Sequence, residues 1–224
     1  MSTAFDAANK LYDQGRFSDA AAAYEKLLQS GRASAALYFN LGNAAFKCGQ
    51  IGRAIAAYRQ AEYLAPRDPD VRANLQFARN QIQGPTLTPN VWQRWLGKLS
   101  LNEWTWLTAS VFWWLLLVLI LQQWRPTLTS RLRAPILILV AVTVLLGFCL
   151  GSALFQTRGT RTAVVIAREA VVRRGPLDES QIAFTVRDGA ELRILDQKDD
   201  WLQVSTDLRR TGWLRRDQVL LSRI

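Results

Sequence analysis

The chain has 224 residues, of which 50% are hydrophobic, and its 28 Lys and Arg against 18 Asp and Glu give a formal net charge of +10. It contains no His, which excludes a Ser-His-Asp or Cys-His nucleophile and every His-containing zinc site. The two Cys, Cys48 and Cys149, lie in different regions of the chain, which argues against a disulfide framework or a Cys-rich metal site.

The charges are spread along the chain except in its middle part. A nucleic-acid-binding arm would concentrate its basic residues, so nucleic acid is not an expected partner. Neither residues 104–124 nor residues 134–157 carry a charge, and seven of the nine Trp fall between positions 92 and 124. The sequence therefore places two water-soluble segments around a very apolar middle.

Residues 1–83 contain a repeat of about 34 residues. A shift of 34 positions superimposes Asn9 on Asn43 and Tyr24 on Tyr58. This period is the length of a helix–turn–helix tetratricopeptide unit, and the stretch A-L-Y-F-N-L-G-N-A-A-F-K-C-G-Q-I-G-R-A-I-A-A-Y closely resembles one. The signature positions of that family hold Gly42, Ala54, Tyr58, Ala61 and Pro66. The alternative is a small helical bundle with Ala-rich faces.

The resemblance implies a partner-binding concave face, lined by the first helix of each helix pair. A solenoid needs about three repeats to bury its core, whereas this chain has two and a closing helix at roughly 69–83. The residues expected on that face are Phe5, Asn9, Tyr12, Asn40, Asn43, Lys47, Arg72 and Asn74. Their amide and cationic groups suit a peptide backbone or a carboxylate. The alternative for each is an ordinary solvated helix face.

Residues 84–103 are expected to be a linker followed by an interfacial helix. The stretch G-P-T-L-T-P-N at 84–90 cannot continue a helix, because it holds two Pro and one Gly. In V-W-Q-R-W-L-G-K-L, which follows, apolar residues form a helical stripe with Arg94 and Lys98 opposite it. Such a stripe suits the headgroup layer of a membrane.

Residues 104–157 are predicted to be a transmembrane hairpin with helices at 104–124 and 134–157. The first run reaches about 31 Å as a helix, close to the hydrocarbon thickness of a lipid bilayer at about 30 Å. Gly147 and Gly151 form a G-x-x-x-G face where another helix can pack closely. The Trp residues expected at the membrane edges are Trp104, Trp106 and Trp124.

The short connection at 122–133 predicts that both soluble segments lie on the same side of the membrane. Its three Arg favour a cytoplasmic connection, which puts the soluble segments in the periplasm. The first residues, M-S-T-A-F-D, lack the features of a signal peptide, so either this start is a processed or trimmed end or both soluble segments are cytoplasmic. The charge pattern gives the periplasmic arrangement a slight preference.

Residues 158–224 consist of short alternating runs bounded by Gly, Pro or Asp, a pattern typical of a small all-β barrel. The runs A-V-V-R-R-G-P, D-G-A-E-L-R-I-L, D-W-L-Q-V and G-W-L resemble a bacterial SH3-like domain. Gly189 and Gly212 are expected in turns. The expected core is Val186, Leu192, Ile194, Leu202, Val204, Leu214 and Val219.

Trp201 and Trp213 resemble the aromatic residues that the SH3-like family places near its groove. In bacteria such domains often face the envelope, and some bind cell-wall peptides, so the resemblance implies peptidoglycan as a ligand. The alternative is that both Trp are half-buried core residues.

The predicted fold class is a multidomain membrane protein with α-helical tetratricopeptide repeats, a two-helix transmembrane hairpin and a C-terminal small all-β SH3-like barrel. This order resembles the BatE-type proteins of bacterial aerotolerance operons. The resemblance implies a bacterial inner-membrane protein that works beside von Willebrand factor A-type membrane proteins and a MoxR-type ATPase in envelope stress.

We therefore expect a non-enzymatic scaffold that binds partner proteins through its repeats, without a cofactor, a metal or a catalytic residue. The alternative of another class is an envelope sensor whose SH3-like domain binds peptidoglycan peptides. An enzyme is the third possibility, but the sequence gathers neither two carboxylates nor a nucleophile and a base at a suitable spacing.

Overall fold

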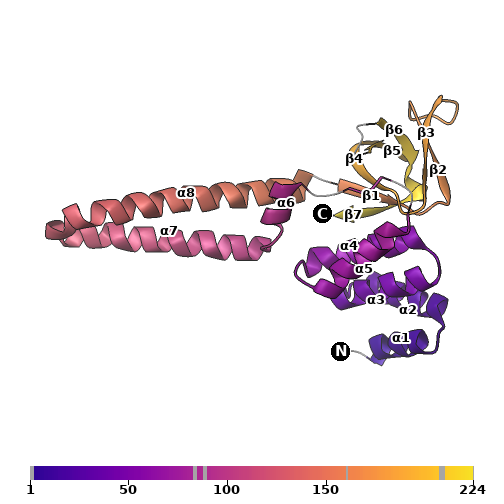
Figure 1. Ribbon diagram of the computed structural model, residues 1–224, viewed down its shortest axis with the longest axis horizontal. Coiled ribbons are helices and arrows are strands. Elements are labelled where there is room, and N and C mark those ends of the chain that lie inside the picture. Colours follow the sequence, from indigo (N-terminus) through magenta and orange to yellow (C-terminus); the bar gives the residue numbers. More distant parts are fainter. Residues whose placement is uncertain (1–2, 83–84, 88–89, 160, 207–209, 224) are drawn as a thin grey trace. The chain divides into compact units, whose positions relative to one another are not determined.

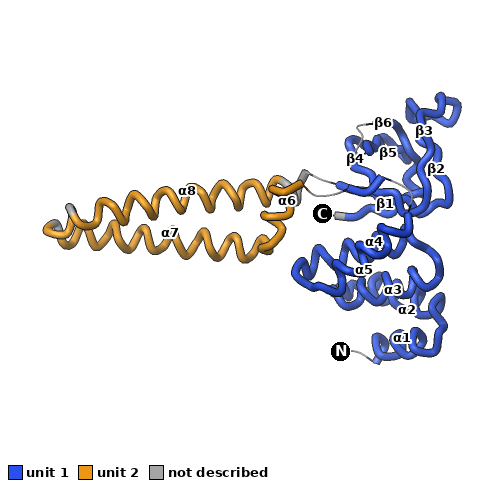
Figure 2. Tube along the Cα trace, viewed as in Figure 1, with its two compact units in different colours: residues 1–88, 160–224 blue, residues 89–159 orange. Residues whose placement is uncertain are grey.

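The computed structural model describes residues 3–82, 85–87, 90–159, 161–206 and 210–223. It divides into two compact units, coloured separately in Figure 2. Unit 1 joins Met1–Thr88 to Thr160–Ile224, and unit 2 is Pro89–Gly159. Helical N-terminal repeats, two long apolar helices and a C-terminal antiparallel all-β domain follow one another along the chain, which confirms the predicted fold class.

The N-terminal part of unit 1, which we call the repeat domain, consists of five helices. They are α1 (Thr3–Asp13), α2 (Phe17–Gln29), α3 (Ala35–Lys47), α4 (Ile51–Leu64) and α5 (Pro69–Asn80). Gly15 and Gly49 adopt positive φ angles of 75° and 73° in the turns within the first two hairpins, which L side chains rarely adopt. The Asp68 carboxylate caps α5 by accepting hydrogen bonds from the backbone N–H groups of Asp70 and Val71.

Small residues allow α3 and α4 to pack closely. A Cβ atom on Gly42 would lie 2.6 Å from the ring of Tyr58, and Ala54 is fully buried. Tyr58, only 2% exposed, fills the space that these small residues leave. Gly42, Ala54 and Tyr58 therefore occupy packing contacts between the helices, as the sequence predicts.

Unit 2 contains the two apolar helices, which lie side by side (Figure 1). It consists of α6 (Val91–Leu96), α7 (Leu101–Trp124), the 3-10 turn η1 (Pro126–Leu128) and α8 (Thr129–Gly159). Residues 101–124 and 131–155 are long and apolar enough to cross a membrane, by length and composition. The helices extend beyond the uncharged runs because polar residues also form helix: a Ser100–Glu103 capping box starts α7.

Two details of unit 2 differ from the sequence prediction. The connection between the helices is a tight turn around η1 instead of the whole segment 122–133. Trp104 is 3% exposed, and its indole N–H donates to the Leu96 carbonyl at 3.1 Å, so it packs inside unit 2 instead of marking a membrane edge. Trp106 and Trp124, in contrast, are 74% and 81% exposed.

The helix expected at the interface is short, because α6 ends at Leu96 and the chain turns before α7. Leu96 is buried in a cluster with Trp104, Cys149 and Ala153. The rings of Trp92 and Trp95 stack with centroids 5.4 Å apart. The apolar side of this segment thus packs partly against α7 and α8, which the stripe pattern alone does not reveal.

The C-terminal part of unit 1, which we call the β domain, is one antiparallel sheet with the order β3-β2-β6-β5-β4-β1-β7. The strands are β1 (Arg161–Val165), β2 (Glu169–Arg173), β3 (Ile182–Arg187), β4 (Glu191–Lys198), β5 (Trp201–Ser205), β6 (Thr211–Arg215) and β7 (Val219–Arg223), with the 3-10 turn η2 (Arg216–Gln218) before the last. All seven predicted core residues lie in or against its hydrophobic cluster, Ile194 only partly buried.

One of the two glycines expected in turns has another role. Gly189 lies in the turn before β4 with a φ of 85°. Gly212 lies within β6, paired with Val204, and is buried. A Cβ atom on Gly212 would come within 2.7 Å of the Arg173 carbonyl oxygen, so this glycine allows β2 and β6 to approach.

Candidate functional site

The surface along α1, α3 and α5, which we call the first-helix face, carries two equivalent hydrogen-bonded triads. In the first, Asn9 Oδ1 accepts hydrogen bonds from Tyr24 Oη at 2.8 Å and Asn40 Nδ2 at 3.0 Å. In the second, Asn43 Oδ1 accepts from Tyr58 Oη at 2.7 Å and Asn74 Nδ2 at 2.9 Å. The triads follow the 34-residue period and tie the first helices of successive repeats together.

The triads place hydroxyl groups in poorly solvated surroundings. Burial raises the pKa of Tyr24 to about 12, and a side-chain hydrogen bond within the first triad opposes this shift. Burial also raises the pKa of Tyr58. Both hydroxyls therefore stay protonated at neutral pH and donate to their Asn partners. The four Asn predicted to meet a partner are thus also structural residues, with their carbonyl or amide groups engaged inside the repeat domain.

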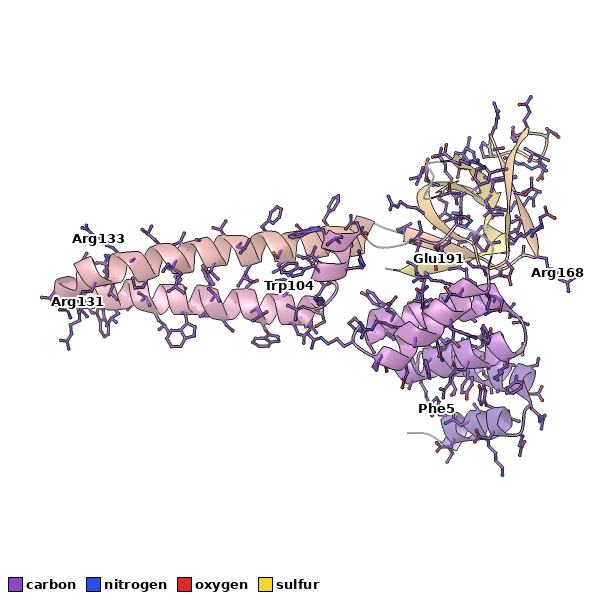
Figure 3. All side chains as sticks on the ribbon, in the orientation of Figure 1. Phe5, Trp104, Arg131, Arg133, Arg168 and Glu191 are labelled. Atoms are coloured by element: carbon purple, nitrogen blue, oxygen red, sulfur yellow. The ribbon has the colours of Figure 1, made fainter. Side chains whose placement is uncertain are left out.

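The other four predicted residues of this face have different surroundings. Phe5 packs on Tyr24 with ring centroids 6.0 Å apart (Figure 3 labels Phe5 on α1), and Tyr12 packs edge-on against Phe17. Both are therefore partly buried in the first repeat. Lys47 is exposed, and Arg72 is exposed with its guanidinium 3.5 Å from the Arg67 carbonyl oxygen.

An aromatic pair on the first-helix face was missed by the sequence prediction. Phe46 of α3 and Phe77 of α5 have ring centroids 5.5 Å apart, and Phe77 remains 56% exposed. The repeat offers a signal, because a shift of 34 aligns Phe77 with Asn43, which the sequence predicts for this face. Lys47 and Phe77 each follow an Asn of the second triad by about one helical turn, Asn43 on α3 and Asn74 on α5, and so lie on the same side of their helices as that Asn. We call Phe46, Lys47 and Phe77 the Phe77 patch.

Trp201 and Trp213 lie on the outer face of the β domain. Along β5 and β6 their neighbours Leu202 and Leu214 are buried in the core, so the alternating Trp side chains point to the opposite face. Both are half-buried, and the Arg215 guanidinium lies 5.4 Å from the centroid of the Trp201 ring. Neither is among the residues of the buried cluster of the β domain.

Family comparisons agree with this division of the chain. Residues 5–69 match the family model of the tetratricopeptide repeat. Residues 167–219 match that of the bacterial SH3 domain. No curated protein matches the chain.

The matched segments leave β1 and most of α5 and β7 uncovered, yet these elements help to join the tetratricopeptide and SH3 segments. Val164 of β1 is fully buried in the same hydrophobic cluster as Ile55 and Tyr58 of α4 and Leu75 of α5. Strands β1 and β7 both pack against α4. We call this contact between the repeat domain and the β domain the junction.

A buried carboxylate lies at the junction. Glu191, the first residue of β4, is 0% exposed and lies between the strands and the repeat helices in Figure 3. Its carboxylate accepts from Arg59 Nη1 at 3.2 Å, from Arg79 Nε at 2.7 Å and Nη2 at 3.0 Å, and from the Leu87 backbone N–H at 3.2 Å. Burial lowers the pKa of Arg59, and the neighbouring Glu191 opposes this shift.

A second carboxylate reaches across the junction to the N-terminus of α4. Gln50 at that N-terminus makes no side-chain capping bond, whereas Asp188 Oδ1 accepts from the Gly52 N–H at 3.2 Å and Asp188 also accepts from the Ile51 N–H. Burial raises the pKa of Asp188, and these backbone hydrogen bonds oppose the shift. The β domain therefore supplies the helix cap that the repeat itself lacks.

Within unit 2 there is free space beside the two glycines proposed for helix packing. A Cβ atom on Gly147 or Gly151 would meet no atom within 4 Å, and both residues are exposed. Helix α7 packs instead near the side of α8 that carries Cys149 and Ala153. The G-x-x-x-G face stays a prediction for packing against another helix.

Proposed function

We propose that this chain is a non-enzymatic, membrane-anchored scaffold that binds partner proteins through the first-helix face of its tetratricopeptide repeats. The observation that carries the proposal is the Phe77 patch, where the Phe77 ring is 56% exposed and Lys47 is exposed, each about one helical turn from an Asn of the hydrogen-bonded triad. Aromatic side chains, Phe among them, are enriched at protein–protein interfaces relative to the rest of the surface.

The proposed anchor is the α7–α8 hairpin in a bacterial inner membrane. Its support is the length and apolar character of both helices, and the exposure of large apolar side chains such as Trp113 and Phe148 (64% and 63%). Exposed apolar surface on this scale suits lipid.

Both soluble parts of the chain are proposed to lie on the same side of that membrane. The support is the junction, because Arg59 and Arg79 precede the hairpin in sequence while Glu191 follows it. Direct hydrogen bonds between these residues support a single compartment for both parts. Exposed Arg125, Arg131 and Arg133 near the η1 turn favour a cytoplasmic turn, and so a periplasmic position for unit 1.

The partners that we propose follow from the resemblance of the architecture to BatE-type proteins. They are von Willebrand factor A-type membrane proteins and a MoxR-type ATPase system in an aerotolerance or envelope-stress complex. The support is the order of the tetratricopeptide and bacterial SH3 segments around two apolar helices.

The scaffold proposal predicts that altering the Phe77 patch removes partners without unfolding the protein. For Lys47→Glu combined with Phe77→Ser, we expect recovery of co-purifying membrane proteins to fall by about tenfold or more, as loss of an interface anchor would produce. The measurement is quantitative mass spectrometry of the full chain purified from detergent-solubilised membranes.

The matched control is Lys26→Glu, which reverses an exposed charge on α2, away from the first-helix face. It should leave partner recovery unchanged. Equal recovery from the patch variant and the control would contradict the proposal.

The second candidate is an envelope sensor whose SH3-like domain binds peptidoglycan peptides. The observation that favours it is the outward position of Trp201, with Arg215 over its ring, and of Trp213 on the neighbouring strand. A shallow depression elsewhere on the β domain is lined by Arg174, Ala183, Phe184, Arg210 and Thr211. Aromatic faces and guanidinium groups suit peptides that carry carboxylates.

This candidate predicts that the full chain in detergent is retained on purified cell walls. Trp201→Ala with Trp213→Ala should lower the retained amount by about tenfold, because the aromatic platform is lost. Leu195→Ala, at a 51% exposed residue of β4, is the control and should bind like the unaltered protein. Failure of the folded, unaltered chain to bind would end the sensor proposal.

A further inference from the structure

The junction covers the end of the repeat array that the sequence leaves incomplete. A solenoid whose last helix pair is unfinished exposes the apolar side of that pair, and such arrays need a cap. Here the third copy contributes α5 alone. Eight residues of α4 are buried, against two in the equivalent helix α2. The additional burial in α4 reflects its contacts with α5 on one side and with β1 and β7 on another.

Residues of minimal size allow this contact. A Cβ atom on Gly52 would overlap the Val165 carbonyl oxygen and the Asp188 carboxylate. A Cβ atom on Gly189 would lie 2.5 Å from Ile82 Cγ2. Each domain thus has a glycine at the point where the other approaches most closely. Gly52 lies in the first turn of α4, and the three atoms nearest to an added Cβ all belong to the β domain.

The charged and polar groups that are buried at the junction have hydrogen-bond partners in the facing domain or in the linker. Glu191 receives both guanidinium groups and a linker N–H, and Asp188 caps α4. Across the described residues, every buried side-chain nitrogen or oxygen has a hydrogen-bond partner. A buried ion cluster of this kind is satisfied only in one docked arrangement, because a shifted arrangement would leave a buried charge without its partner.

We infer that the β domain is the C-terminal cap of the repeat array, so that the repeats and the SH3-like domain open and unfold as one cooperative unit. The partner of the α4–α5 surface is therefore this chain's own β domain, held by Glu191 and Asp188. A protein bound to the first-helix face and a ligand bound to the outer strands would each stabilise the whole of unit 1.

The substitution Gly52→Ala should change the rate of hydrogen exchange in α4 in opposite directions, depending on whether α4 faces solvent or packs against the β domain. In a helix that faces solvent, Ala is more favourable than Gly, so the variant would slow the opening of α4. At a closed junction the added methyl group clashes. For the full chain in lipid nanodiscs, we expect hydrogen exchange to accelerate by about tenfold or more. The acceleration should occur in step in α4, α5, β1 and β7.

The control is Ser18→Ala, because Ser18 is exposed and precedes Gly52 by the 34-residue repeat. It should leave exchange in β1 and β7 unchanged. Slower exchange in α4 of Gly52→Ala, or faster exchange confined to one of the two domains, would overturn the inference.

A second variant tests the junction from the β domain if Gly52→Ala does not fold. Asp188→Ala removes the cap of α4, so amides of residues 51–54 should exchange about tenfold faster although the altered residue lies in another domain. Glu179→Ala, at an exposed residue of the β domain, is its control. If Asp188→Ala changes exchange in the β domain alone, the two domains are independent and the inference fails.

Discussion

Replacing Glu191 with Ala is expected to lower the free energy of unfolding of unit 1 by about 3–5 kcal/mol, because two guanidinium groups lose their buried carboxylate. Arg59 and Arg79 have only 6% and 14% of their side chains exposed, so water cannot replace the lost hydrogen bonds without opening the junction. A loss of this size approaches the whole stability of many small domains. Urea-dependent pulse proteolysis of the full chain in nanodiscs measures it.

A variant without the three charges distinguishes the effect of losing the ion pairs from the effect of losing side-chain volume. Glu191→Leu combined with Arg59→Met and Arg79→Met removes all three charges and leaves apolar side chains of similar size. We expect it to regain about half or more of the lost stability, since burying no charge is often as favourable as burying a paired one. Glu179→Ala should change stability by less than about 0.5 kcal/mol. A Glu191→Ala protein as stable as this control would contradict the prediction.

Asn43→Ala is expected to destabilise the repeat domain by about 2–3 kcal/mol, because it leaves two donors without their acceptor. Tyr58 Oη and Asn74 Nδ2 both donate to Asn43 Oδ1, and Tyr58 is 2% exposed. The same denaturation experiment measures this loss. In the Tyr58→Phe background the cost of Asn43→Ala should be smaller, because one of the two donors is already absent.

The same result decides how partner binding should be tested. If Asn43→Ala unfolds part of the repeat domain, the loss of a partner in that variant reports stability and not contact. Lys47 and Phe77 avoid this difficulty, because both are exposed and lie outside the triads. If Asn43→Ala lowers the free energy of unfolding equally with and without Tyr58→Phe, Asn43 and Tyr58 do not stabilise the repeat domain through each other. Asn43 would then again be a residue expected only to contact a partner.

The two units also respond to different changes. Substitutions at the junction act on unit 1, where charges and glycines decide the fit. In unit 2 the residues that matter for packing are apolar, as in the cluster of Leu96, Trp104, Cys149 and Ala153. A stability change at Glu191 should therefore not alter protease protection of α7 and α8.

The sequence by itself determined the features that repeat over short distances. The 34-residue offset gave the helix pairs with Gly42 against Tyr58, and the uncharged runs gave two long apolar helices. The alternation of apolar residues gave the strands and their core. Each of these follows from a local period, because a helix or strand repeats its buried face at a fixed spacing.

Only the tertiary structure decided which polar residues meet. Arg79 and Arg59 reach Glu191 across 112 and 132 positions, and Asp188 caps a helix that begins 137 positions earlier. The tertiary structure also shows that Asn43 accepts a hydrogen bond inside the repeat domain and that Trp104 is buried. No local period encodes such pairs, because their partners come from separate elements brought together by folding. A single charged residue in a strand looks the same in sequence whether it faces water or two buried guanidinium groups.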